Sequence, residues 1–303
     1  MPGSMNKILL LANKVISRSY WFNNVLFPNC RKFWTQNQNN LELVNLGSTS
    51  ALHAFDYKGT GITAANWAMA PQTFVGDYQI LRNYYSFVKK GATILLPICP
   101  FSSLGGGNEF LPDYYYSILN IISIPNASFR KKIQVKQMQD YPLLYYPIVE
   151  LFYSIGRLFK KHKEICTESE LKVDAANRVK NWKKEFSIES FDDDFTLLQK
   201  DLYSDSVKAL KDIISFCIQR NLKPVLVLPP LSKPMRDLLS ESVVEKFITR
   251  FLKDANEMNI PTLNHLIDST FDNEQLFRDS FLLNKKGAKI FTNEILSELK
   301  NLS

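Results

Sequence analysis

The sequence predicts a three-layer α/β sandwich, in which helices cover both faces of a central parallel sheet, with a helical insertion. Two observations predict it. Short apolar segments that end in polar loops have the composition of buried parallel strands, and amphipathic helical patterns alternate with them along the chain. The 303 residues are 45% hydrophobic and 22% charged, which is the composition of a globular protein with a core large enough for such a sheet.

Three apolar runs are predicted to be the central strands of this sheet, and a shorter run adds a fourth. Each run ends in a polar or Pro-containing loop, as a buried strand does. With typical sheet sizes, these runs predict a sheet of about five strands. The central strands are residues 41–46, 93–98 and 224–229, and the fourth lies within 260–268.

Four helices are predicted between and after these strands. In the first, apolar residues recur at spacings of three and four, and the Lys-Lys-Gly sequence at 89–91 is expected to end it. Two others precede the third and fourth strands, and the last one closes the chain. Their ranges are 71–91, 206–221, 240–259 and 285–300.

The alternation stops between residues 104 and 205, where a Gly-rich loop, aromatic stretches and an acidic patch at 192–194 follow one another. We expect this segment to be a helical insertion over the mouth of the sheet and not a separate domain. Residues 1–4 resemble an expression remnant. The expected organisation is an N-terminal amphipathic segment at 1–40 and a single α/β domain at 41–303 that contains the insertion.

The net charge of +7 suits an anionic lipid, a phosphorylated sugar carrier or nucleic acid about equally. No uncharged apolar run is long enough for a spanning helix. Residues 5–27 and 141–163 mix aromatic residues with Lys and Arg, which is typical of helices at a membrane interface and also of core-packed helices with a basic end. With no secretory cleavage pattern and no CxxC, a cytoplasmic location is expected, with peripheral membrane docking as the alternative.

Several function classes lack their motifs. The four cysteines do not have metal-ligand spacing, and the Gly-rich loop at 105–107 lacks the GK[ST] ending of a phosphate loop. No dinucleotide fingerprint, zinc site or nucleic-acid-binding module is recognisable. We therefore expect no cofactor, no metal and no nucleic-acid partner.

Loops at the carboxyl ends of parallel strands form the ligand crevice of an open α/β sheet. Three such loops have unusual polar content, at 47–50, 100–107 and 229–233. In the first, the backbone N–H groups from Gly47 to Ser50 can hold an oxyanion or a phosphate. Its hydroxyl residues can also cap the next helix, and both roles can hold at once.

Five segments resemble, in their order, the motifs of SGNH/GDSL-type hydrolases. The likeness is greatest to the divergent branch of D-alanyl-transfer-like and capsule-cluster proteins, in which the nucleophile block reads Gly-Ser-Ser. It leaves out residues 1–40 and 104–205, and it implies a flavodoxin-like parallel sheet. The segments are VNLGSTSALHAFDY, GITAANWAMAPQTFVGDYQIL, FVKKGATILLPICPFS, NLKPVLVLPPLS and FRDSFLLNKKGAKIFT.

Carried over residue by residue, the resemblance implies a catalytic site. Thr49 stands at the nucleophile position, and Ser48 stands where the family usually has Asp. Gly61 or Asn66 would supply oxyanion donors. Asp279 would be the acid of the triad.

The base of that triad is missing. The closing motif keeps Asp279 and Asn284, but Leu282 stands where the histidine belongs. A hydroxyl nucleophile is weak without a base, which contributes about 10²–10⁴-fold. Restoring the base by Leu282→His is expected to raise turnover of an activated ester if Thr49 or Ser48 faces Asp279.

The chain has three histidines that are candidates for a replacement base. His53 follows Thr49 by four residues, so a helix would place it one turn away. His265 follows the fourth strand and is within reach of the crevice. His162 lies in a basic cluster and is expected to be solvated. Each can also be an ordinary surface or hydrogen-bonded histidine, and direct contact of Asp279 with the hydroxyl is a poorer route.

The helix that follows Asn66 carries two further polar residues, Gln72 and Asp77. They could face the crevice between the loops. The sequence favours the other interpretation, in which they cap and solvate the helix.

Three functions remain open. The leading hypothesis is an acyl-transferase or esterase that acts on a glycan hydroxyl in surface polysaccharide or teichoic acid assembly. The second is a catalytically silent relative that binds a glycan or a lipid-linked sugar. The third is transfer of a group other than acyl, with the same loops holding a phosphate.

Overall fold

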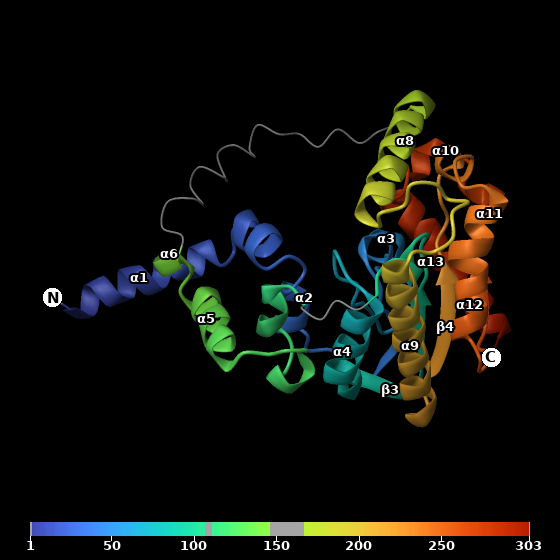
Figure 1. Ribbon diagram of the computed structural model, residues 1–303. Coiled ribbons are helices and arrows are strands. Elements are labelled where there is room, and N and C mark those ends of the chain that lie inside the picture. Colours follow the sequence, from blue (N-terminus) through green and yellow to red (C-terminus); the bar gives the residue numbers. More distant parts are fainter. Residues whose placement is uncertain (1, 107–110, 146–166, 303) are drawn as a thin grey trace. The chain divides into compact units, whose positions relative to one another are not determined.

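The computed structural model describes residues 2–106, 111–145 and 167–302 (Figure 1). The chain divides into two compact units, one formed by residues 1–37 and 109–163 and the other by residues 38–108 and 164–303. This differs from the expected single domain with one insertion. The N-terminal segment and the first part of the predicted insertion form a unit of their own, whereas the second part belongs to the unit with the sheet.

The larger unit is built on a five-stranded, all-parallel sheet with the strand order β2-β1-β3-β4-β5. This confirms the α/β class, the parallel sheet and the central position of the three predicted strands. The short edge strand β2 was not predicted. The strands are β1 (Leu41–Asn45), β2 (Ala64–Asn66), β3 (Val88–Pro97), β4 (Lys223–Leu228) and β5 (Thr262–Asn264).

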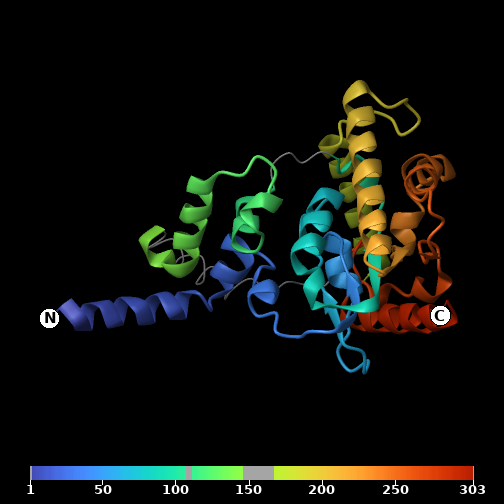
Figure 2. The same ribbon diagram turned by 90° about the horizontal axis from the view of Figure 1, so that it is seen from below.

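Helices α3 and α13 pack on one face of this sheet, where Leu43, Leu95 and Val225 form a buried cluster with Phe291 of α13. Side chains alternate between the two faces of a strand. Residues such as Ile94, which alternate with the first set, are therefore buried on the opposite face, where α4, α9 and α12 pack against one another (Figures 1 and 2). Both faces of the sheet are thus covered by helices.

The helices of the larger unit follow the predicted pattern, and the predicted helix at 240–259 is a continuous run of α11, η6 and α12. Their bounds are α3 (Thr49–Ala54), α4 (Phe74–Tyr84), η2 (Tyr85–Phe87), η3 (Ser102–Leu104), α8 (Glu168–Glu185), α9 (Leu197–Gln219), α10 (Lys233–Arg236), α11 (Glu241–Val244), η6 (Glu245–Thr249), α12 (Arg250–Ala255), η7 (Ser269–Phe271), η8 (Glu274–Leu276) and α13 (Lys285–Asn301).

One predicted boundary is wrong. The helix predicted at 71–91 ends at Tyr84, and β3 begins at Val88, so the Lys-Lys-Gly sequence lies inside a strand and does not terminate a helix. Pairing across the sheet explains the difference, because Val88 lies opposite Leu41 of β1, and the exposed side chains of Lys89 and Glu42 form an ion pair at 3.3 Å beside it. Gly91 has a φ of +80°, and the β1–β3 register shifts nearby, as a glycine in a strand often permits.

The smaller unit consists of short helices around an aromatic core. The ring centroids of Phe22 and Phe27 lie 4.9 Å apart, and Trp34 lies 5.4 Å from Phe27. Its elements are α1 (Pro2–Ile16), η1 (Phe22–Leu26), α2 (Arg31–Trp34), η4 (Asp113–Ser117), η5 (Ile121–Ser123), α5 (Phe129–Asp140) and α6 (Pro142–Tyr145).

Of the two segments whose composition is typical of a membrane interface, the structure describes the first almost completely and the second only in part. In residues 5–27, Phe22 and Phe27 are buried, whereas Leu10 and Leu11 of α1 are exposed. Most of residues 141–163 lies outside the described residues. Among the described helices, none combines the length and the apolar composition that are needed to cross a membrane.

Candidate functional site

The carboxyl edge of the sheet brings together the loops after β1, β3 and β4 and the segment that contains Asp279. Ser232, after β4, donates its hydroxyl to the backbone oxygen of Ser280 at 2.7 Å. Helix α8 joins the same edge, because Asp174 Oδ2 accepts from the N–H of Ser280 at 3.0 Å and from its hydroxyl at 2.5 Å. This part of the predicted insertion therefore contacts the carboxyl edge of the sheet.

Aromatic side chains attach α8 to this edge. Phe101, in the loop after β3, lies 5.2 Å from Trp182 of α8 and 4.8 Å from Phe247 of η6, measured between ring centroids. Trp182 also contacts Phe281 edge-on at 5.1 Å. These ring contacts link α8 and η6 to the loop after β3 and to the segment that contains Asp279.

A buried carboxyl group stabilises the turn after β1 through hydrogen bonds. The N–H of Gly47 donates to Asp77 Oδ1 at 2.7 Å, and Gln72 Nε2 donates to the same oxygen and, at 3.3 Å, to the backbone oxygen of Gly47. Gly47 has a φ of +109°, and a Cβ atom there would lie 2.7 Å from the Cβ of Ala51. Only glycine fits this turn without strain.

A cavity of about 40 Å³ lies beside this turn. Its walls include the hydroxyl-bearing residue Ser48, together with Gln72, Asp77, Cys99 and Ser102. The volume is sufficient for a water molecule, and the lining is polar enough to hold one. Ser48 Oγ accepts a hydrogen bond from the backbone N–H of Gln72 at 3.2 Å, so its own proton can be donated to another group in the cavity.

Asp77 has an unusual acidity. Burial raises the pKa of its carboxyl group from 3.8 to about 7, although the hydrogen bonds from Gly47 and Gln72 act in the opposite direction. A carboxyl group with a pKa near 7 can accept a proton at neutral pH, which an ordinary carboxylate does poorly.

The sequence interpretation of Gln72 and Asp77 as solvated, capping residues is therefore wrong for Asp77, which is 4% exposed. A signal was present in the sequence. Asp77 follows Phe74 by three residues and precedes Leu81 by four, so it lies on the apolar stripe of its helix. An acidic residue on such a stripe is buried and requires a partner.

A second polar cluster surrounds His53, one turn after Thr49 on α3. His53 Nε2 lies 3.4 Å from Arg278 Nη1. Burial and the positive charge of Arg278 lower the pKa of His53, while the charge of Asp279 acts against them. The ring is therefore neutral at pH 7, and Nε2 can accept the hydrogen bond from Arg278.

Asp279 is held by its own turn. Its Oδ1 accepts from the N–H groups of Phe281 and Leu282 at 3.0 and 2.9 Å, and Arg178 of α8 lies 3.4 Å away. Leu282 is buried beside it. Within the described residues, no histidine donates to or accepts from the hydroxyl of Ser48 or Thr49.

The expected oxyanion donors are placed elsewhere. Asn66 Nδ2 donates to three carbonyl oxygens at the end of α3, the shortest being that of Ala51 at 3.1 Å, and Oδ1 accepts from Asn45 and Ala68. Asn66 thus secures α3. Gly61 precedes β2 and lies at the amino edge of the parallel sheet, opposite the predicted crevice. Neither geometry fits an oxyanion role.

The remaining predicted residues have structural contacts. Ser50 Oγ lies 2.6 Å from Cys99 Sγ, which fixes the first turn of α3 to the loop after β3. Asn284 caps α13 by accepting from the N–H groups of Lys286 and Gly287, both at 3.0 Å. His265 contacts Asp268 and neither hydroxyl candidate, and His162 lies outside the described residues.

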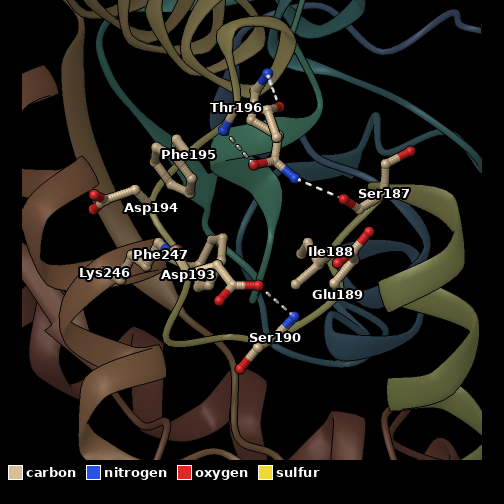
Figure 3. Close-up of a pocket in the computed structure, with 11 residues that line it drawn as sticks. Ser187, Ile188, Glu189, Ser190, Asp193, Asp194, Phe195, Thr196, Lys246 and Phe247 are labelled. Atoms are coloured by element: carbon tan, nitrogen blue, oxygen red, sulfur yellow. Dashed lines mark hydrogen bonds between the residues drawn. The ribbon is translucent and has the colours of Figure 1, made fainter.

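A larger cavity, of about 240 Å³, lies beside the segment that joins α8 to α9 (Figure 3). Gln199 Nε2 donates to the backbone oxygen of Ser187 at 3.1 Å, and Lys246 Nζ donates to the backbone oxygen of Asp193. These contacts hold the segment itself in place. Gln199 and Lys246 therefore stabilise the local fold of this segment.

No protein-family model matches this sequence, and no curated protein matches it. The interpretation of the site consequently depends on its geometry and on the order of the sequence motifs.

Proposed function

We propose that this chain is an SGNH-like protein of surface polysaccharide or teichoic acid assembly, which transfers an acyl group to or from a glycan hydroxyl. The motif order and the polar turn at the carboxyl edge of a parallel sheet support this. One observation carries the chemistry: Ser48 and the buried Asp77, with its pKa near 7, line the same cavity.

In the proposed reaction, Ser48 Oγ attacks the acyl carbonyl carbon and its proton passes through a water molecule to Asp77. The N–H groups of Thr49 and Ser50 lie in the first turn of α3 and have no intrahelical acceptor, so they can stabilise the oxyanion. The tetrahedral intermediate expels the donor alcohol, which takes the proton from Asp77. The glycan hydroxyl then attacks the acyl carbonyl carbon of the acyl-serine, with Asp77 again accepting the proton. The bond between Ser48 Oγ and the acyl group breaks, and Ser48 takes the proton back from Asp77.

This assignment differs from the one implied by the resemblance, in which Thr49 is the nucleophile. Thr49 and His53 remain the rival pair within the same function, because they lie one helical turn apart and His53 is neutral at pH 7. The two pairs have different surroundings. Ser48 opens to the Asp77 cavity, while His53 contacts the Arg278 segment.

Labelling with a fluorophosphonate probe tests the proposal, since it requires an activated hydroxyl group. We expect labelling of the wild type with a pH midpoint near 7, retention in Thr49→Ala, and loss in Ser48→Ala and Asp77→Asn. Asp174→Asn, which changes another hydrogen-bonded acid at the same edge, is the matched control. Loss of labelling in Thr49→Ala and His53→Ala, with Ser48→Ala unaffected, would instead identify the rival pair.

A second candidate is a catalytically silent protein that binds a glycan or a lipid-linked sugar. The buried Leu282 at the base position and the pairing of Asp279 with Arg178 favour it. In that case the folded wild type remains unlabelled at every pH, and lipid-linked oligosaccharide still protects the Ser48 loop from hydrogen exchange.

A further inference from the structure

A histidine and three carboxyl groups meet where β5 ends against α13. His265 directly follows β5, and its side chain is only 6% exposed. Its Nδ1 lies 2.9 Å from Asp268 Oδ2 and 3.9 Å from Glu294 Oε2. These three atoms all lie within 4.8 Å of one another, so small side-chain movements would bring them to one metal ion.

Two atoms of this cluster are buried without a hydrogen bond from any described residue. One is Glu294 Oε2, and the other is Nε2 of the buried His265. Nε2 lies 3.1 Å from Glu298 Oε1, but the two are not aligned as a hydrogen bond. Buried polar atoms in proteins almost always have partners, so the missing partner of Glu294 Oε2 indicates an ion or a water molecule beside it.

The surrounding structure holds the cluster in position. Asp268 Oδ1 accepts from the N–H of Thr270 at 2.9 Å, which directs Oδ2 towards His265. Glu294 and Glu298 lie one turn apart on α13. Phe291 of the same helix contacts the His265 ring edge-on, with 5.3 Å between ring centroids.

We infer that this cluster is a binding site for a divalent transition-metal cation of the Zn²⁺ type, coordinated by His265 Nδ1, Asp268 Oδ2 and Glu294 Oε2. Glu298 lies 3.1 Å from the opposite ring nitrogen, and a rotation of its carboxylate would let it accept a hydrogen bond from Nε2–H in the metal-bound state. It would then orient the imidazole and increase its basicity, as the outer carboxylate of a carboxylate–histidine–metal arrangement does. An imidazole ligand favours Zn²⁺ over Mg²⁺ and Ca²⁺, which prefer oxygen ligands only.

Tetrahedral Zn²⁺ with ligand distances of about 2.0–2.1 Å separates neighbouring ligand atoms by about 3.3 Å. The Nδ1 to Oδ2 distance must therefore open slightly from 2.9 Å, and Glu294 must close from 3.9 Å. Both changes are smaller than about 1 Å, which is the scale of a side-chain adjustment on metal binding. The ion would tie the loop after β5 to α13, away from the Ser48 cavity. Its role is therefore independent of the proposed acyl transfer.

The test uses the full chain, freed of metal by dialysis against EDTA and titrated with ZnCl₂ in a calorimeter. We expect one saturable site, a higher Tm with Zn²⁺, and no comparable binding of Mg²⁺. Glu294→Gln, at a half-buried position that tolerates the change, should weaken Zn²⁺ binding by at least about tenfold, and Glu298→Gln by about 10–100-fold. Both variants should lose the Tm rise that Zn²⁺ produces.

Glu257→Gln is the matched control, because this exposed glutamate pairs with Lys211 and is not part of the cluster. It should bind Zn²⁺ as the wild type does. A folded wild type that binds no Zn²⁺, or a Glu294→Gln variant with unchanged affinity, would overturn the assignment. The cluster would then be an ion-pair network, in which carboxylates balance the charge of a protonated His265 and no metal is bound.

Discussion

The backbone N–H of Gly47 lies 2.7 Å from the carboxyl oxygen Oδ1 of Asp77. This contact joins the turn after β1 to helix α4, which begins well beyond β2 along the chain. It places Ser48 at the wall of a cavity that it shares with Asp77. The same residue therefore supports the turn and supplies a proton acceptor beside its hydroxyl group.

The raised pKa of Asp77 predicts a distinctive pH dependence of stability. The folded-state pKa, about 7, exceeds the value of 3.8 expected for the unfolded chain, so the folded protein binds the proton more tightly. The contribution of Asp77 to the free energy of unfolding is then greatest below pH 4. It falls by at most about 4 kcal/mol as the pH rises to 7. Above pH 7 it no longer changes.

Asp77→Asn should remove that contribution, because the amide keeps an oxygen for the N–H of Gly47 and does not titrate. We expect the stability difference between variant and wild type, from urea unfolding at pH 4 to 8, to shift in favour of the variant as the pH rises. A difference that is constant with pH would show that Asp77 titrates normally.

Gly47→Ala should destabilise the protein and distort the Ser48 cavity. The positive φ alone costs about 1–2 kcal/mol, and the new methyl group would meet Ala51, which adds about 1–3 kcal/mol. Gly59→Ala is the matched control, because Gly59 also has a positive φ, of +80°, but nothing lies near its missing Cβ. Equal loss of stability in the two variants would contradict the close contact.

Arg278→Ala should raise the pKa of His53. Burial is the main cause of the lowered pKa of His53, and the positive charge of Arg278 lowers it further. Without the guanidinium, only burial opposes the negative charge of Asp279, which raises the pKa. The histidine Cε1–H resonances, followed by NMR against pH, measure the shift directly. Lys211→Ala, at a remote surface ion pair, should leave the His53 titration unchanged. A fall in the His53 pKa would contradict the contact.

Leu282→His is expected to leave p-nitrophenyl acetate hydrolysis close to the wild-type rate. The partner that a new histidine needs, Asp279, already binds two backbone N–H groups and lies 3.4 Å from Arg178, and Ser48 opens towards Asp77. A clear rise in turnover that disappears on adding Thr49→Ala would show that Thr49 faces Asp279. It would restore the arrangement implied by the family resemblance.

Much of the fold could be predicted from local pattern. The apolar runs at 41–46, 93–98 and 224–229 became β1, β3 and β4, because a strand buried on both faces leaves a continuous apolar signal. The edge strand β2 has only three residues, Ala64–Asn66, and leaves no such signal. The strand begins at Val88 because this residue pairs with β1. The helical spacing of the apolar residues before it continues to Val88, so the sequence did not reveal this boundary.

The sequence by itself determined the layers, the parallel sheet and the turn that carries Ser48 and leads to Thr49 at the start of α3, since these follow from periodicity and from strand direction. Only the tertiary structure decided which groups meet there. The pKa of Asp77 depends on its burial beside Gly47. The side-chain amide of Asn66 is engaged by hydrogen bonds to the last residues of α3. The contact of Glu294 with His265 depends on where α13 packs. Burial and distance between residues far apart in sequence are properties of packing, and no local pattern contains them.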